Sequence, residues 1–227
     1  MKACIFDLDG TLTDTLESLV YSVRATLREM GLPEITKEQC RTFVGNGARR
    51  LMEESLTAVG DENAERLEEG MQVYGRIFDE NCTYHVTPYK GIVKMLEALK
   101  DRGIKLAVLS NKPHAQTVKV VREIFGDGVF DYVSGQQEGI RRKPAPDGVW
   151  HILEVLGAEA SECLYVGDSE VDIETGKNAG LKTISVTWGF RSEQELREAD
   201  PEHMIAKPAD LLAYCLLYTS PSPRDLW

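Results

Sequence analysis

The 227-residue chain is predicted to be an α/β protein with a doubly wound parallel sheet and an inserted layer of helices. Three observations predict this class. Short apolar runs without polar alternation recur along the chain, as in strands that are buried on both faces. Amphipathic stretches of helical length separate these runs. A long segment after the first run has helical patterns and no strand pattern.

Four apolar runs are predicted to be buried parallel strands, and four amphipathic stretches are predicted to be the helices between them. The strands are Ala3–Phe6, Lys105–Leu109, Cys163–Val166 and Thr183–Val186, and the helices are Gly91–Arg102, Ala115–Phe125, Pro146–Leu156 and Val171–Ala179. Gly103, Gly157 and Gly180 follow three of the helices, where a left-handed residue commonly ends a helix. This alternation indicates βαβ units.

The inserted segment contains four helical patterns: Leu16–Met30, a helix after the capping-box string Thr36–Gln39, Gly47–Ala58 and Asn63–Phe78. Ligands of open α/β sheets bind at the carboxyl ends of the strands. We expect the inserted helices to cover that end, and therefore a covered site. The predicted domains are a core of residues 1–14 and 85–214 and a helical cap of residues 15–84.

The last residues have a different character. Residues 215–225 resemble the translation of a sequencing adapter, and a natural Ser/Pro-rich tail is the alternative. We expect residues 215–227 to be a non-native tail and the natural C-terminus to be missing. The tail is therefore kept out of the fold prediction.

Charge and composition exclude several functions. The chain has 26 Lys and Arg against 37 Asp and Glu, a net charge of −11, so nucleic acid and anionic membranes should be repelled. No stretch approaches the ~20 apolar residues of a membrane span. The five cysteines form no CxxC pair, and no apolar signal region precedes the first strand. We expect a cytoplasmic protein that attracts a small anionic substrate through local cations or a metal.

Two acidic residues follow the first strand directly. In an extended chain, the side chains of Asp7 and Asp9 point the same way. Two ionised carboxylates ~4 Å apart repel by ~4 kcal/mol at an effective dielectric constant of about 20. The pair therefore needs a cation, a shared proton or separation. Gly10 permits a sharp turn and Thr11 offers a hydroxyl and an N–H. For this short pattern alone, an Asp-rich turn at a strand end is the alternative.

The longer string Ile5–Thr15 resembles the first motif of the haloacid dehalogenase-like phosphatases. Three further motifs of that superfamily occur in order beside predicted elements: Ser110-Asn111 after the second strand, Lys143-Pro144 before a helix, and Gly167–Asp172 after the third strand. The resemblance covers about residues 1–210. It implies a Rossmann-like hydrolase core with a helical cap and a Mg²⁺ cofactor.

By this resemblance, Asp7 is the nucleophile and also a Mg²⁺ ligand. Asp9 protonates the leaving oxygen and then activates water, and its backbone carbonyl reaches the metal. Haloacid dehalogenases lack an acid at the position of Asp9, so its presence favours phosphate chemistry. Asp168 is the second carboxylate ligand of the metal, which prefers oxygen ligands. Capping of the helix that begins near Ser169 is the alternative role for Asp168, and the two roles are compatible.

The other motif residues are expected to surround the phosphate. Thr11, Ser110 and Asn111 would donate hydrogen bonds to it, and Lys143 would neutralise the charge that phosphate shares with Asp7. Asp172 lies four residues after Asp168 on one helix face and would orient Lys143 or a metal-bound water. Phosphomutase relatives commonly carry Glu at the position of Gly167. Its absence here favours a hydrolase.

The substrate is suggested by the string Phe43–Leu51, which resembles the cap loop of bacterial phosphoglycolate phosphatases. Its glycines would let backbone N–H groups approach an anion, and Arg49 or Arg50 would pair with a carboxylate. A plain turn followed by exposed arginines is the alternative. Phosphoglycolate is the leading substrate, while pyrophosphatase, sugar-phosphate phosphatase and β-phosphoglucomutase-like activities stay open.

From another class, a catalytically silent binding protein of the same fold would require loss of a critical residue. The five critical residues, Asp7, Asp9, Ser110, Lys143 and Asp168, are all present. The expected partner is a small phosphorylated metabolite. The sequence makes no prediction of the oligomeric state.

Overall fold

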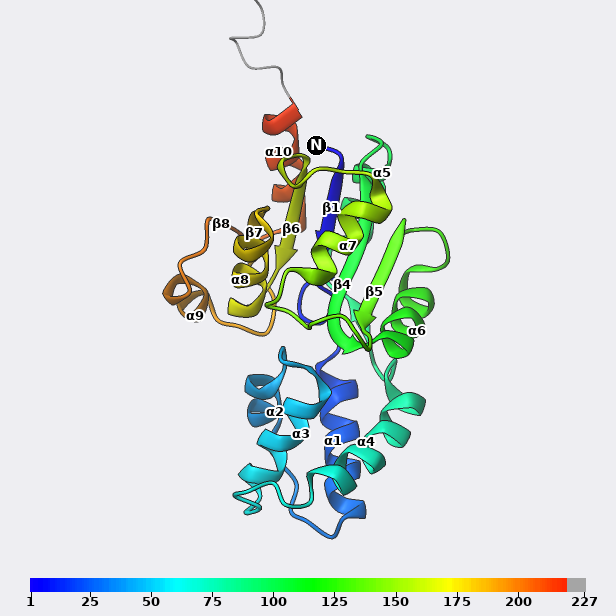
Figure 1. Cartoon of the computed structure of the whole chain (residues 1–227), viewed down its shortest axis with the longest axis vertical. Helices are drawn as coiled ribbons and strands as arrows, with labels where there is room; N and C mark the ends of the chain where they lie inside the picture. The colour runs from blue at the N-terminus through cyan, green and yellow to red at the C-terminus, as the bar shows by residue number, and fades with distance from the viewer. Residues whose placement is uncertain (220–227) are drawn as a thin grey trace, which may run out of the picture.

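A six-stranded parallel sheet forms the centre of the computed structural model, which describes residues 1–219 (Figure 1). The strand order is β5-β4-β1-β6-β7-β8. The strands are β1 (Ala3–Phe6), β4 (Lys105–Pro113), β5 (Tyr132–Gln136), β6 (Cys163–Gly167), β7 (Lys182–Val186) and β8 (His203–Ile205). The predicted class, a doubly wound parallel sheet with inserted helices, is confirmed.

The central strand β1 shows why these runs form a buried sheet. All four of its residues are fully buried, and it pairs with β4 on one side and β6 on the other. Because side chains alternate along a strand, Ala3 and Ile5 pack on one face while Cys4 and Phe6 pack on the opposite face. Both faces therefore need a helical layer.

The two helical layers are supplied by different parts of the chain. Helices α7 (Asp147–Leu156) and α8 (Glu170–Ala179) cover the face of Ala3 and Ile5. Helices α5 (Ile92–Lys100), α6 (His114–Phe125) and α10 (Pro208–Thr219) cover the other face. The connections carry α9 (Glu193–Glu198) and a 3₁₀ turn, Ala160–Glu162. In the described part of the chain, no helix has the length and apolar character to cross a bilayer.

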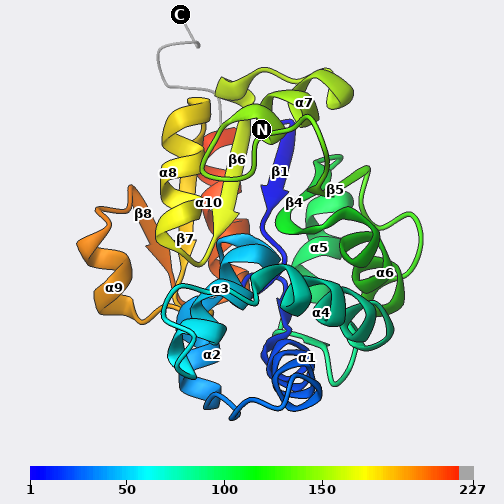
Figure 2. The same cartoon turned by 60° about the horizontal axis from the view of Figure 1, so that its bottom comes forward.

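Four further helices lie beyond the tips of the strand arrows (Figure 1), and the tilted view of Figure 2 shows them in front of that end of the sheet. They are α1 (Leu16–Glu29), α2 (Lys37–Phe43), α3 (Gly47–Ala58) and α4 (Leu67–Asn81). The short antiparallel strands β2 (Thr13–Asp14) and β3 (Thr87–Pro88) pair where the chain leaves the sheet and returns to it. The helices stand over the carboxyl ends of the strands, and the exact boundaries at residues 15 and 84 stay a prediction.

One expected helix start is confirmed and another differs. Thr36 and Gln39 form the predicted capping box at the start of α2. The fourth cap helix begins at Leu67 and not at Asn63. The Asp61 carboxylate accepts hydrogen bonds from the N–H groups of Glu65 and Arg66, and Ala64 has a φ of 47°. These contacts form a turn, which delays the helix.

The predicted non-native tail begins inside α10. Cys215 is buried with Leu211 in the main hydrophobic core, and the helix extends to Thr219. Residues 220–227, which hold most of the adapter-like string, lie outside the described residues. The origin of the tail stays a prediction.

Candidate active site

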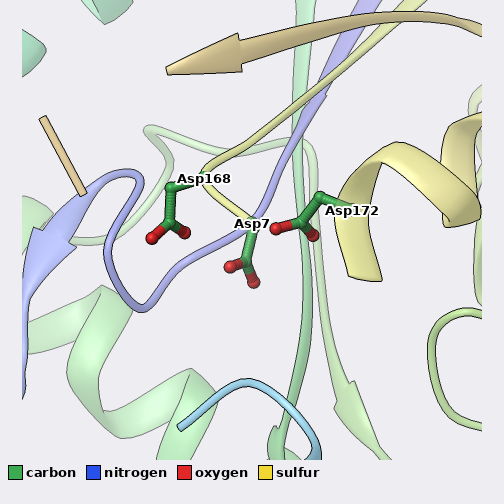
Figure 3. A group of neighbouring side chains, drawn as sticks. All are labelled: Asp7, Asp168 and Asp172. Atoms are coloured by element: carbon green, nitrogen blue, oxygen red, sulfur yellow. The ribbon is translucent and has the colours of Figure 1, made fainter. Parts of the chain in front are cut away.

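Three buried carboxylates meet at the carboxyl end of the sheet (Figure 3). Asp7 follows β1, Asp168 follows β6, and Asp172 lies in the first turn of α8. One oxygen of each carboxylate lies within 4.8 Å of those of the other two. Because β1 and β6 are neighbours in the sheet, residues far apart in the sequence meet at one edge. The structure therefore brings the two predicted metal-binding carboxylates together.

Asp168 is fixed by two loops. Its Oδ1 accepts a hydrogen bond from Thr11 Oγ1 at 3.1 Å, and its Oδ2 accepts one from the Phe190 N–H at 2.7 Å. A Cβ atom at Gly10 or Gly189 would lie only 2.3 or 2.4 Å from the Asp168 side chain, so glycine is required at both positions for this close approach. The Thr11 hydroxyl, predicted to bind phosphate, is directed to Asp168 in this structure.

The Asp172 side chain is held by hydrogen bonds at the N-terminus of α8. Ser169 is the N-cap of α8 and forms a capping box with Asp172, so the alternative of Asp168 as the N-cap is wrong. Asp172 Oδ1 also accepts hydrogen bonds from Tyr165 Oη at 3.0 Å and Lys143 Nζ at 2.7 Å. Asp172 therefore contacts Lys143, one of the two partners considered for it from the sequence.

Gly167 leaves the space that Asp172 occupies. A Cβ atom at position 167 would lie 2.2 Å from Asp172 Cγ. Any larger residue at this position, including the Glu of phosphomutase relatives, would displace Asp172. The presence of Gly here is therefore tied to the contact between Asp172 and Lys143.

Lys143 contacts two of the three carboxylates, Asp7 and Asp172. Its Nζ lies 2.8 Å from Asp7 Oδ1, and its side chain is only 4% exposed. Burial opposes the charge of the ammonium, but Asp172 and Asp7 outweigh burial and raise the pKa of Lys143. Asn111 fixes the Lys143 backbone by accepting from its N–H and donating to its carbonyl. The ammonium is therefore a permanent charge beside Asp7.

The negative charge of this site exceeds its positive charge. Burial raises the pKa of Asp7 well above its usual range and that of Asp168 to about 7. Four carboxylates face two ammonium groups: Asp7, Asp9, Asp168 and Asp172 against Lys112 and Lys143. With all four carboxylates ionised, two negative charges are left over. A divalent cation would balance them and favour the ionised forms that burial alone disfavours, and carboxylate oxygens suit a hard cation. The residues present therefore fit a metal ion.

Asp9 has a partner that the sequence analysis missed. Its Oδ1 accepts hydrogen bonds from Thr15 Oγ1 at 2.6 Å and from the ammonium of Lys112. Lys112 follows Asn111 in β4 and is buried. Its position two residues after Ser110 was an available signal, because residues i and i+2 of a strand share a face. Nothing in the sequence indicated that the Lys112 side chain on this face would contact Asp9.

In the second predicted motif, Ser110-Asn111, the side-chain amide of Asn111 already donates hydrogen bonds within the protein. Asn111 Nδ2 donates to the carbonyl oxygens of Gly45 in the cap and Lys143 in the core, at 2.9 and 3.1 Å. The amide of Asn111 has two N–H donors, and with one on each carbonyl it links the cap loop to the core. Ser110 Oγ accepts from the Lys112 N–H at 3.2 Å, and Ser110 lines the cavity described next. Donation by both residues to phosphate stays a prediction.

A cavity lies between the strand ends and the cap, with an empty volume of about 470 Å³ when the part open to solvent is included. The core contributes polar residues: Asp7, Asp9, Ser110, Asn111, Lys112 and Lys143. The cap contributes mainly apolar ones: Leu19, Val44, Gly45, Gly47, Ala48, Leu51, Tyr74 and Phe78. Charged groups therefore lie on the cavity floor under an apolar roof.

The predicted carboxylate-binding arginines lie outside this cavity. Arg49 pairs with Glu68 at 2.5 Å and its side chain is 56% exposed. Arg50 pairs with Glu53 and Glu54 on the same helix. The structure does not bring Arg49 to the other site residues, and its role in binding substrate stays a prediction.

Fold and site together define a hydrolase with an acidic centre at the carboxyl edge of a parallel sheet, beneath a helical cap. A sequence model described as haloacid dehalogenase-like hydrolase matches residues 4–186, and the chain belongs to this family.

Relatives of known sequence and structure agree with this assignment. The phosphoglycolate phosphatase of Aquifex aeolicus VF5 is 36% identical, over 93% of this chain and 95% of its own, and that of Haemophilus influenzae Rd is 34% identical, over 92% and 95%. The crystal structure of a predicted phosphoglycolate phosphatase from Haemophilus somnus 129PT has a TM-score of 0.88 at 27% identity, covering 95% of this chain and 98% of that one. The chain is therefore a phosphoric monoester hydrolase.

Proposed function

We propose that this chain is a Mg²⁺-dependent phosphatase that hydrolyses 2-phosphoglycolate through an aspartyl-phosphate on Asp7. The observation that carries the proposal is the position of Asp7 on the cavity floor, bonded to Lys143 and beside Asp168. The choice of substrate is supported by the relatives named phosphoglycolate phosphatase, which align over nearly their whole length.

The first half-reaction transfers the phosphoryl group to the protein. An Asp7 oxygen attacks phosphorus while the bond to the leaving oxygen breaks, and Asp9 gives that oxygen a proton. Lys143 offsets the charge that develops between phosphate and Asp7. Asp7, Asp168 and the Asp9 carbonyl would hold the Mg²⁺, whose charge would screen the phosphate from the carboxylates.

The second half-reaction restores Asp7. Asp9, now ionised, takes a proton from a water molecule, whose oxygen attacks phosphorus while the bond between phosphorus and the Asp7 oxygen breaks, and inorganic phosphate is released. Bulk water must be excluded during the first step, and the apolar cap side chains serve this purpose. The cap loop is bonded to the core by Arg191, which donates to the Val44 carbonyl, and by Asn111, which donates to that of Gly45. These bonds would have to open for substrate entry.

The direct test is a phosphate-release screen over two- and three-carbon phosphates, sugar phosphates, nucleotides and pyrophosphate. We expect 2-phosphoglycolate to give the highest kcat/KM and EDTA to abolish release. Preference for pyrophosphate or a sugar phosphate would make the substrate assignment wrong and leave the chemistry intact. Absence of release from every compound, including a generic aryl phosphate, would favour a silent binding protein.

Metal binding has a readout that does not depend on turnover. Mg²⁺ at about one hundred times its Kd should raise the melting temperature by about 5–10 °C, because binding to the folded state alone stabilises it. Asp168→Asn should remove most of this shift, since it removes a predicted ligand. Asp127→Asn, in an exposed side chain on the protein surface, should preserve it. An undiminished shift in Asp168→Asn would show that Mg²⁺ binds elsewhere.

We propose that the enzyme works in the cytoplasm and acts on a small phosphorylated metabolite. None of the five cysteines forms a disulfide and all five are buried, which fits a reducing compartment. The acidic net charge of −11 disfavours nucleic acid and anionic membranes as partners.

A further inference from the structure

We propose that Lys112 binds the carboxylate of the substrate and thereby makes the enzyme selective for phosphorylated carboxylic acids. This inference rests on the proposed phosphatase function and assigns the substrate class to one residue. Lys112 is a buried cation, and the hydrolysis steps proposed above do not use it.

Lys112 is built into the cavity between core and cap. Its side chain is 2% exposed and lines the cavity, and its Nζ lies 5.5 Å from the centre of the Phe78 ring of α4. Asp9 Oδ1 is the one acceptor that the described residues offer to Nζ. An ammonium has three donors, so two are left for a ligand. A buried cation with spare donors is costly unless a ligand uses them.

The other cations near the cavity have their partners already. Lys143 is bonded to both Asp7 and Asp172. Arg49 and Arg50 pair with glutamates on the cap surface. Among the described residues, the roof of the cavity carries no charged side chain and is apolar apart from Tyr74. A second anionic group on the substrate would therefore meet Lys112 first.

The position of Lys112 also fits the length of the substrate. The leaving oxygen must lie beside Asp9 to receive its proton, and Lys112 contacts Asp9. In 2-phosphoglycolate a single methylene group separates that oxygen from the carboxylate. The ammonium can thus bind Asp9 and the substrate carboxylate together, and the low local dielectric around this buried side chain strengthens the new contact.

The test compares Lys112→Met with the wild-type enzyme on two substrates, 2-phosphoglycolate and ethyl phosphate, which has the same chain length and no carboxylate. We expect the variant to lose about 30-fold in kcat/KM for 2-phosphoglycolate, mainly through KM, as for loss of one charge-assisted hydrogen bond. Ethyl phosphate shares only the effect that Lys112 has on Asp9, so its loss should be about 10-fold smaller than the loss for 2-phosphoglycolate. Lys94→Met, an exposed lysine on α5, should change neither value.

Binding without turnover gives a second readout. In an Asp7→Asn background, calorimetric titration with 2-phosphoglycolate should show about 30-fold weaker binding when Lys112→Met is added. An equal loss for both substrates would overturn the proposal and show that Lys112 acts only by positioning Asp9. A loss of selectivity in Arg49→Met with none in Lys112→Met would also overturn it. A wild-type enzyme that does not prefer 2-phosphoglycolate over ethyl phosphate would instead contradict the proposed function.

Discussion

Asp7→Asn is expected to lower kcat by about 10⁴-fold or more, because the amide that replaces the carboxylate is neutral and a poor nucleophile. The variant should remain folded. Asparagine has nearly the same shape, and Lys143 keeps its bond to Asp172. The loss should therefore appear in the chemical step and not in the amount of folded protein.

The measurement is single-turnover phosphate release with Mg²⁺ and excess enzyme, with circular dichroism as the check on folding. Asp101→Asn, at the exposed end of α5, is the matched control and should retain wild-type kcat. Acid-quenched wild-type enzyme should yield a phosphorylated peptide that contains Asp7. Turnover of Asp7→Asn within tenfold of the wild type would rule out attack by this side chain.

Much of the sheet could be predicted because buried parallel strands have a strong sequence pattern. The runs at β1, β4, β6 and β7 are apolar on both faces, so they stand out from amphipathic helices. The edge strands β5 and β8 were missed. The first contains Ser134 and Gln136 and the second has only three residues, so neither has the length or the apolar character of a central strand.

The position of the site was also predictable, since the carboxyl ends of parallel strands lie at one edge. That rule brings Asp7 and Asp168 to the same place without knowledge of the strand order. Pairings between separate elements were not predictable. Thr11 donates to Asp168, Arg49 binds Glu68, and Lys112 binds Asp9. Each contact depends on how loops and cap pack against the sheet, and no local pattern encodes that packing.

Lys143→Met is expected to affect both activity and stability. It should lower kcat by about 10³-fold, because the charge on the transferring phosphate loses its fixed counter-ion. In EDTA it should also lower the free energy of unfolding by about 3–5 kcal/mol, since loss of one partner leaves buried charges unpaired. Those charges are Asp7 and Asp172, which both bond to Lys143. Urea unfolding of the metal-free proteins measures the change.

Two comparisons show whether this loss comes from the buried charges. Lys2→Met removes an exposed lysine that pairs with Glu162, and it should leave the urea midpoint unchanged because exposed pairs contribute little. Adding Asp172→Asn to Lys143→Met removes one of the stranded charges, so the double variant should be more stable than the sum of the single effects. Strict additivity, or an equal loss in Lys2→Met, would contradict the view that Lys143 stabilises the fold by neutralising these carboxylates.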